Sequence, residues 1–564
     1  MQNYNPFIIL ILLFFSSELI AQNLKLTIIG STDEETSLIS DLNYNSQHVD
    51  YNSILTEANL LRDKIIRFGY IDLKRSTISK TNDTSFHVKF QLNNKYETIE
   101  INYDSTKINK NIINLTSKQV FNTYFVIPFE DIEKTLEHIN IKVANNGFPF
   151  AKINLSEIKT KDNNTLIATL IIQNKENERR LDKIIIKGYD KFPKSYLKRY
   201  LKIKPEKIFN IETIKKKMVA LNNLGFAEQT KDSEVLFTKD STTLYMYLKK
   251  TQSNTFDGFL GFSTNEQTNK IDFNGYLNLE LNNNLNYGET FKLLYKSDES
   301  EQRNFEARLN LPYLFSTPIG TEFSLRILKR DSSFTSVNQK ANVFYQLNSK
   351  NRLFIGIEST ESSNLLEDDI NTDITDYKSN LYNLKYIFEN RYSFNSLFRI
   401  KSKIQIELGF GKREITNSTE NQEKITLDAF NSFYLNNKNS LYTKVSAALI
   451  NSNTYFENEL YTFGGINSIR GFAENSILAN RYIVLNTEYR YQLSSNIYAH
   501  TILDFSNFEN RISNIRENLY GFGLGFGIRT NSGLLKFNFA NGKTEEQNFK
   551  FSNSKIHISL ITVF

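Results

Sequence analysis

Residue types that commonly carry catalysis or bind metals are sparse in this chain of 564 residues. It contains no cysteine, which excludes thiolate metal sites and cysteine nucleophiles. The five histidines are scattered without metal-ligand spacing, and there is no Gly-x-Ser-x-Gly elbow or His-Glu-x-x-His motif. Carboxylates are plentiful, but no pair stands out. We therefore predict that the protein is not an enzyme and that it uses no cofactor and no metal.

The most informative motif lies in a long segment between two strand-like runs, residues 451–478. Within it, residues 464–472 read Gly-Gly-Ile-Asn-Ser-Ile-Arg-Gly-Phe. Glycines on either side of an arginine allow a tight turn and a close approach of the backbone. The planar fork of a guanidinium suits carboxylates, which it can bind through two parallel hydrogen bonds. The candidate residues of this motif are Gly464, Gly465, Arg470, Gly471 and Phe472.

A second glycine motif follows downstream and has a period of two. It comprises Gly521, Gly523, Gly525 and Gly527, which alternate with apolar residues inside a strand-like run. No helical pattern follows, so this is not a dinucleotide-binding loop. A period of two places all four glycines on one face of a strand. We expect that face, free of side chains, to leave room for a loop packed inside a barrel.

The second half of the chain is a series of alternating runs that predicts a membrane β-barrel. From about residue 254 to the end, apolar and polar residues alternate over 9–14 residues between polar turns. About ten tilted residues span a bilayer as a β-strand, with apolar residues facing lipid and polar ones facing the lumen. We count about sixteen such runs. The last one places on one face Ile556, Ile558, Leu560 and the terminal Phe564.

The first half contains three repeats. A helical pattern ends in glycine and an aromatic residue at Gly69, Gly147 and Gly225, which are 78 residues apart both times. Glycine ends a helix readily because it adopts the left-handed conformation at low cost. Each unit reads as an α+β module with the order β-α-α-β-β. The predicted bounds are 22–95, 96–180 and 181–253, followed by a barrel over 254–564.

The N-terminal segment predicts export from the cytoplasm. Residues 7–15 read FIILILLFF, and a small residue, Ala21, follows shortly after. An apolar run of this length with a small residue behind it is typical of a signal peptide. We assign residues 1–21 to it.

These motifs resemble two known families. The three units resemble POTRA (polypeptide-transport-associated) domains, and the segments 464–472 and 521–540 resemble the BamA/TamA-type outer-membrane assembly superfamily. Three units and about sixteen strands look most like its TamA branch. In that superfamily the loop folds into the lumen and acidic residues hold its arginine, which the resemblance maps onto Glu488 and Asp504. The terminal aromatic strand resembles the signal that delivers such barrels to their assembly machinery.

The resemblance implies an outer-membrane assembly or translocation factor with its POTRA domains in the periplasm. Its expected partners are outer-membrane lipids, unfolded client proteins and a periplasmic or inner-membrane-anchored protein. Clients would bind POTRA sheet edges by strand addition and enter through a seam between the first and last barrel strands. The alternative is a two-partner-type secretion translocator that exports a dedicated passenger. A net charge of only +6 gives no case for nucleic-acid binding.

Overall fold

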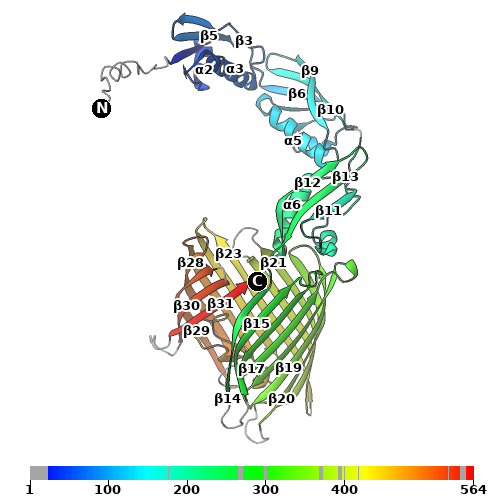
Figure 1. The fold of residues 1–564 in the computed structure, drawn as a ribbon, viewed down its shortest axis with the longest axis vertical. Helices are drawn as coiled ribbons and strands as arrows, with labels where there is room; N and C mark the ends of the chain where they lie inside the picture. Colours follow the sequence, from blue (N-terminus) through cyan, green and yellow to red (C-terminus); the bar gives the residue numbers. More distant parts are fainter. Residues whose placement is uncertain are drawn as a thin grey trace, which may run out of the picture. The chain divides into compact units, whose positions relative to one another are not determined.

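The computed structural model describes most of the chain after residue 22. The described residues are 23–175, 177–264, 271–297, 302–366, 373–391, 397–398, 400–416, 418–530, 533–545 and 554–563. The proposed signal peptide and Phe564 lie outside them. The chain forms two compact units, Met1–Arg180 with Ile208–Asn210, and Leu181–Lys207 with Ile211–Phe564. Figure 1 labels their elements.

The first α+β domain packs two helices on one sheet. Its elements are β1 (Leu24–Ile29), α2 (Asp33–Asp41), β2 (Gln47–His48), α3 (Tyr51–Arg67), β3 (Lys74–Arg75), β4 (Ser79–Asn82) and β5 (Ser85–Gln91). The sheet order is β2-β1-β5-β3, and β4 also pairs with β5. Asp50 caps the N-terminus of helix α3, where its carboxylate accepts the amide hydrogen of Ser53 at 2.7 Å. Its apolar residues face the sheet at helical spacing: Ile54, Ala58, Leu61 and Ile65.

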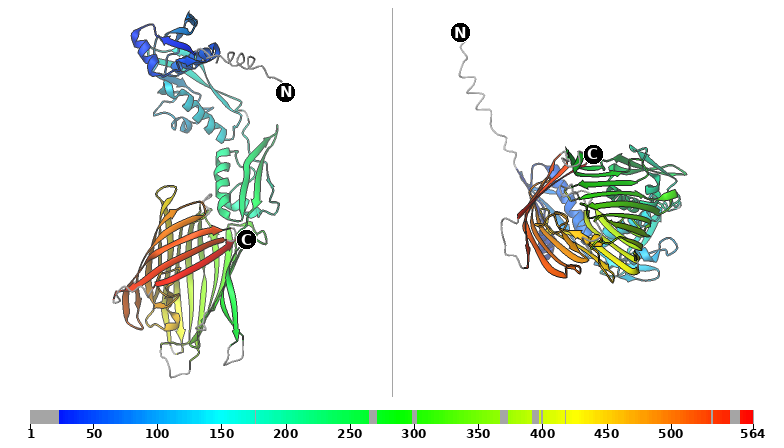
Figure 2. Two further views of the ribbon diagram at one scale, coloured as in Figure 1. Left: turned by 60° about the vertical axis from the view of Figure 1, so that its left-hand side comes forward. Right: turned by 90° about the horizontal axis from the view of Figure 1, so that it is seen from below.

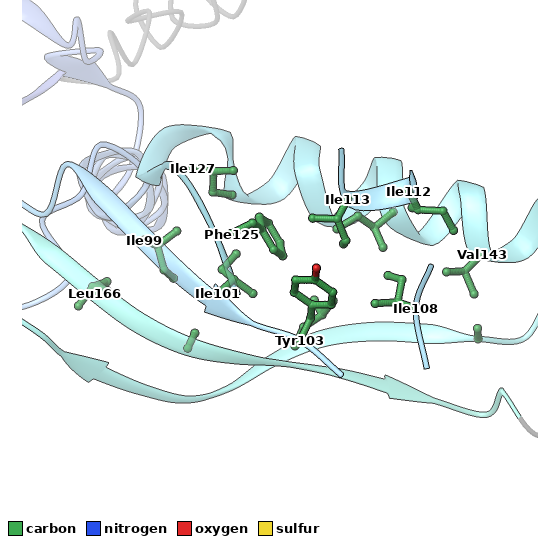
Figure 3. Close-up of a cluster of buried hydrophobic side chains, with 14 of the residues drawn as sticks. Ile99, Ile101, Tyr103, Ile108, Ile112, Ile113, Phe125, Ile127, Val143 and Leu166 are labelled. Carbon is green, nitrogen blue, oxygen red and sulfur yellow. The ribbon is translucent and has the colours of Figure 1, made fainter. Parts of the chain in front are cut away.

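The second domain has the same framework with an additional hairpin. Its elements are β6 (Thr98–Asn102), α4 (Lys110–Ile113), β7 (Gln119–Val120), β8 (Tyr124–Pro128), η1 (Phe129–Asp131), α5 (Ile132–Asn145), β9 (Lys152–Thr160) and β10 (Thr165–Gln173). The sheet order is β7-β8-β6-β10-β9. The hairpin β7–β8 lies between the two helices, where the expected order had no strand. Phe125 and Ile127 of β8 enter the hydrophobic core, and their burial explains why this segment joins the sheet (Figure 3).

The third domain belongs to the same compact unit as the barrel. Its elements are β11 (Lys183–Lys187), the short π-helix η2 (Tyr196–Tyr200), α6 (Ile211–Leu221), η3 (Asn222–Leu224), β12 (Ala227–Phe237) and β13 (Thr242–Lys250). The three strands are ordered β11-β13-β12. Helix α6 buries Ile214, Met218 and Leu221.

The helix-end glycines of the three domains have a shared role. Gly69, Gly147 and Gly225 have φ values of 103°, 95° and 80°, so each lies in the left-handed region that glycine adopts cheaply. Each glycine carbonyl also accepts a hydrogen bond from the chain where it leaves the domain. The donors are the amides of Tyr96 and Arg179 and the hydroxyl of Thr251, at 2.9, 2.7 and 2.6 Å. The glycine therefore ends the helix, and its carbonyl holds in place the segment by which the chain leaves the domain.

Sixteen antiparallel strands of the described residues form a closed barrel, as the alternation predicted (Figures 1 and 2). They are β14 (Thr255–Thr264), β15 (Ile271–Asn282), β16 (Thr290–Ser297), β17 (Arg303–Leu311), β18 (Ile319–Arg330), β19 (Phe334–Gln346), β20 (Asn351–Asn364), β21 (Tyr377–Arg391), β22 (Ile400–Ile415), β23 (Ser418–Tyr434), β24 (Asn439–Asn451), β27 (Arg481–Gln492), β28 (Ile497–Asn510), β29 (Ile515–Thr530), β30 (Gly533–Thr544) and β31 (Ser554–Val563). A short helix, η4 (Leu314–Ser316), follows β17. No described helix is both long and apolar enough to cross a bilayer.

The barrel strands turn apolar residues outward and polar residues inward. On β20, Leu353, Ile355 and Ile357 are exposed on the outer face, whereas Glu358 is buried inside. The exposed aromatic side chains of the outer face are Tyr and Phe, because the chain has no Trp. They include Tyr345, Tyr382, Phe410, Phe433, Tyr489, Tyr491 and Tyr520. The tyrosines among them have amphipathic rings, which favour the membrane–water interfaces.

Candidate functional site in the barrel lumen

The long loop between β24 and β27 has structure of its own inside the barrel. It contains a 3₁₀ turn, η5 (Glu457–Glu459), and two short strands, β25 (Tyr461–Phe463) and β26 (Ile477–Ala479), which pair with each other. The segment from Gly464 to Ser476 connects these strands and carries the arginine motif. The loop therefore presents Arg470 from a short hairpin rather than from an open coil.

Arg470 is only 4% exposed and is held mainly by Asp504 on β28. Its backbone amide and its Nε both donate to Asp504 Oδ2, at 2.9 and 2.8 Å. Its Nη2 donates to Asp504 Oδ1 at 2.6 Å. The carboxylate thus accepts the guanidinium through both oxygens, which is the strong, oriented form of this ion pair.

The second carboxylate, Glu488 on β27, joins Arg470 to another arginine. Nη1 of Arg470 donates to Glu488 Oε1. The other oxygen of Glu488 accepts from Nε of Arg490 at 2.7 Å. The guanidinium of Arg490 stacks over the rings of Tyr442 and Phe398, with its carbon 3.8 and 4.7 Å from the ring centroids. Two arginines are therefore balanced by two carboxylates, as buried charges require.

Arg490 is a member of the site that the motif did not point to. The signal was its position two residues after Glu488, which places both side chains on the inner face of one strand.

The glycine face of β29 meets the loop at one position. A Cβ atom on Gly521 would collide with the carbonyl oxygen of Arg470. Gly523 lies against the backbone of β30, whereas Gly525 and Gly527 lie beneath the rings of His500 and Tyr498. The expectation that all four glycines leave room for the loop therefore holds for Gly521 alone. The other three share its face, but neighbouring strands and side chains fill the space.

A glycine outside the motif completes the contact. A Cβ atom on Gly542 of β30 would lie 2.7 Å from the carbonyl oxygen of Gly471 and 2.8 Å from the ring of Phe472. Gly471 itself has a φ of 94° and would clash with the backbone of Asn541 and Gly542 if it carried a side chain. The Arg-Gly-Phe tip thus lies against two glycines of the barrel wall, Gly521 and Gly542.

The remaining motif residues shape the hairpin. Gly464 and Gly465 have φ values of 116° and 91°, where the chain turns out of β25. Phe472 packs on a buried apolar cluster between loop and wall. Its members are Phe463, Ile469, Ala479, Val484, Phe508 and Leu519.

A second ionic anchor holds the base of the loop to β22 and β23, the two strands before β24 in the barrel. Arg413 of β22 is fully buried and donates to Glu459 of η5 at 2.5 Å and to Glu420 of β23 at 2.7 Å. Glu459 also accepts from Gln422 at 2.9 Å. Next to it, Glu457 pairs with Arg330 of β18 at 3.0 Å.

The loop thus contacts β18, β22 and β23 through η5, and β27, β28, β29 and β30 through its tip. None of the η5 contacts was predicted, because their partners are spread over more than a hundred residues of sequence.

A polar cavity of about 500 Å³ remains in the lumen beside the loop. Charged side chains of opposite sign line it and pair across the strands. Lys340 pairs with Glu407 at 2.6 Å and with Glu358 at 2.9 Å. Lys385 pairs with Glu322. Within the described residues, the lumen at this level is therefore crossed by ion pairs.

Among the described residues, the strand pair that closes the barrel has the fewest residue pairs. There, β14 and β31 share Thr255↔Val563 and Phe256↔Thr562, whereas β14 and β15 share ten pairs. On β31, Ile556 and Ile558 are exposed on the outer face. Leu560 lies on the same strand, and Phe564 is outside the described residues.

Comparisons with known proteins agree with this architecture. Residues 180–250 match the POTRA family model, described as a surface antigen variable number repeat. The chain is similar in structure to CdiB from Escherichia coli, with a TM-score of 0.53, 15% identity, and coverage of 91% of this chain and 97% of that one. For CdiB from Acinetobacter baumannii the TM-score is 0.51, the identity 16%, and the coverage 83% and 90%. No curated protein sequence matches the chain significantly.

The fold and these matches define the class of protein. The chain is a closed antiparallel barrel with an apolar outer face, as transmembrane β-barrels have, preceded by three α+β domains, of which residues 180–250 match the POTRA model. This fold agrees with the architecture that the resemblance to the BamA/TamA-type superfamily implied. The TamA branch stays a prediction.

Proposed function

We propose that this protein is a non-enzymatic factor that inserts client proteins into the outer membrane or translocates them across it. The observation that carries the proposal is the arginine-tipped loop, which Glu488 and Asp504 hold in the lumen. It occurs together with a seam at which the described residues of β14 and β31 form two residue pairs. A loop with this many buried ionic contacts keeps the barrel interior in one arrangement. The seam is then the part of the wall whose strands separate with the smallest loss of free energy.

The contacts between the third POTRA domain and the barrel support transfer of clients from one to the other. The hydroxyl of Tyr196 donates to the carbonyl of Gly288 at 3.0 Å, in the turn between β15 and β16. Nε of Arg199 donates to the carbonyl of Ser316 at 2.6 Å, in the next turn on the same side. Burial raises the pKa of Tyr200, in the same π-helix, to about 12. A client bound to this domain is therefore delivered at the periplasmic mouth.

The test is depletion of the protein in its own host, followed by quantification of the outer-membrane and secreted proteomes. We expect several outer-membrane proteins to fall, and we expect the wild-type gene but not Arg470→Ala to restore them. If Arg470→Ala restores the full proteome and its barrel shows an unchanged heat shift on a gel, the proposed role of the loop is wrong.

Secretion of a dedicated passenger is the second candidate, and the polar lumen cavity beside the loop favours it. A translocator would lose one secreted protein on depletion and keep its outer-membrane proteins. It would also conduct ions when reconstituted in a planar bilayer, with larger currents in Arg470→Ala. Assembly instead predicts loss of many barrels and a wild-type channel that is mostly closed.

A further inference from the structure

The first-strand edge of the first domain is already filled by the domain itself. On the outer side of β1, the amide of Leu26 donates to the carbonyl of Ser46 at 2.8 Å. The amide of Ile28 donates to the hydroxyl of Tyr44 at 3.0 Å, and that of Gly30 to the hydroxyl of Thr36 at 2.9 Å. These outward amides therefore have no hydrogen left for an incoming strand.

The second domain closes the corresponding edge with a complete strand. All five residues of β6 pair with β8, from Thr98↔Pro128 to Asn102↔Tyr124. The outer side of β8 is covered in turn by β7. The hairpin β7–β8 therefore occupies the place where a client strand would add.

The third domain leaves this edge open. Asp182 donates its amide to Thr242 on the side of β13, whereas Leu181 exchanges hydrogen bonds with Glu206 and Lys207 on the other side. Because alternate residues of a strand face the same side, Lys183, Ile185 and Lys187 direct their amides and carbonyls outward. Among the described residues, no backbone group pairs with these three on that side.

The strands at the opposite edges of the second and third sheets carry features that hinder pairing with another strand. Strand β12 has two register shifts against β13 and carries charged side chains such as Lys231 and Glu234. Strand β9 has a bulge at Glu157, which has a φ of 52°. Bulges and charges are how proteins protect sheet edges from pairing. Strand β11, by contrast, pairs with β13 without a shift and has three consecutive isoleucines.

The open edge lies in the most basic part of the chain. Residues 180–217 contain thirteen Lys and Arg residues and four acidic ones, although the whole chain has a net charge of only +6. Lys183 and Lys187 are exposed at the two ends of β11. Lys207 lies at the start of this edge, where its carbonyl accepts the amide hydrogen of Leu181 at 2.9 Å. The edge therefore suits a negatively charged strand.

We propose that the outer edge of β11 is the strand-docking site of this protein and that it takes an extended client segment in which apolar and acidic residues alternate. The segment would add beside β11 by main-chain hydrogen bonds, with its carboxylates near Lys183 and Lys187. The first two domains do not dock clients at their first strands, because they have completed those edges themselves. This inference rests on the proposed function.

The test uses single-cysteine variants, since the natural chain has no cysteine. Lys187→Cys places a thiol at the open edge. Thr27→Cys is the matched control, because it is an exposed residue on the closed strand β1 of the first domain. The probe is a synthetic peptide of alternating Val and Glu with one cysteine, added to the full chain in detergent micelles. We expect disulfide capture by Lys187→Cys and little by Thr27→Cys. Equal capture by both variants would overturn the proposal.

Further variants and probes distinguish the contribution of the lysine charges to peptide binding from that of main-chain hydrogen bonds. Lys183→Glu with Lys187→Glu should weaken binding of the Val–Glu peptide about tenfold, and a Val–Lys peptide should reverse the preference. A heat shift on a gel confirms that each variant is folded. If the double variant instead loses binding to phosphatidylglycerol vesicles and keeps the peptide, the basic edge serves lipid and the proposal is wrong.

Failure of this inference differs from failure of the proposed function. If Lys183→Glu with Lys187→Glu binds the peptide normally while depletion still removes outer-membrane proteins, the assignment of the docking site to β11 is wrong and the proposed function stands. If depletion leaves both proteomes intact while capture at Lys187→Cys persists, the function is wrong and the edge still binds extended chains.

Discussion

Four charged residues of the lumen form one connected network at the scale of single residues. Asp504 accepts three hydrogen bonds from Arg470, and Glu488 links Arg470 to Arg490. A buried ion is tolerated only when it is paired, and removing its partner leaves a charge that water cannot reach. A substitution at any one of these residues therefore changes the charge balance around the other three.

We predict that Asp504→Asn destabilises the barrel more than Glu488→Gln does. Breaking a buried pair costs about 3–5 kcal/mol, and Asp504 accepts both the side chain and the backbone amide of Arg470. The measurement is the temperature at which the folded band shifts on a semi-native gel. Leu503→Ala, the outward neighbour of Asp504, is the control. A larger shift for Glu488→Gln would contradict the order of the two carboxylates.

We also predict that Gly521→Ala is worse than Gly525→Ala. An added methyl group at 521 meets the carbonyl oxygen of Arg470, which can move only if the loop moves. At 525 it meets the side chains of His500 and Asn538 rather than a backbone atom of the loop. Overpacking of this kind costs about 1–3 kcal/mol, and the loop should become open to proteases in Gly521→Ala. Limited proteolysis of intact cells measures this, and equal sensitivity of the two variants would count against the contact.

At the scale of elements, the loop between β24 and β27 is fastened at both its tip and its base. The tip binds β27 and β28 through Arg470, and η5 binds β22 and β23 through Glu459. These strands lie on both sides of the loop in the strand order of the barrel. The loop is therefore a brace between two parts of the wall.

This brace predicts that the two anchors act together. Glu459→Gln should destabilise the folded barrel by about 3–5 kcal/mol, because it leaves the fully buried Arg413 with one carboxylate fewer. Combined with Glu488→Gln, the loss should differ from the sum of the single losses if the loop couples the anchors. A double-mutant cycle on the gel-shift temperature tests the coupling. Strict additivity would mean that the tip and the base are held independently.

At the scale of the whole molecule, the ionic contacts of the loop and the seam lie on different parts of the wall. The ionic contacts of the loop concentrate on the strands from β18 to β28. The seam between β14 and β31, the first and last strands of the barrel, has two residue pairs among the described residues. We expect a barrel built in this way to open at the seam without breaking its lumen network.

The seam can be locked with paired cysteines in this cysteine-free chain. Thr255→Cys with Val563→Cys should bridge the seam, and Thr255→Cys with Glu280→Cys should bridge the continuous pair β14–β15. We expect the first pair to abolish client assembly until a reductant is added, and the second to leave it unchanged. Assembly rates in reconstituted liposomes measure the effect. Full activity of the oxidised seam variant would exclude an opening seam.

Much of the fold could be predicted from the sequence, because the patterns that indicate its strands and helix ends are local. Alternation of apolar and polar residues over ten positions follows from a strand between lipid and lumen, and it predicted the sixteen strands. A glycine that ends a helix is also a local feature, as Gly69, Gly147 and Gly225 illustrate. The hairpin β7–β8 was not predicted, since its short strands gain their stability from Phe125 and Ile127, which pack in a core built from residues far apart in the sequence of the domain.

The residues of the site divide in the same way. Arg470 and its flanking glycines are adjacent in sequence, so their spacing alone marked the tip of a loop. Arg490, Gly542 and the anchor of Arg413 with Glu459 arise where strands far apart in sequence meet around one lumen. The open edge of β11 likewise depends on which edges the other domains have filled. Local periodicity determines which elements form, whereas closure of the sheets decides which side chains and which edges face one another.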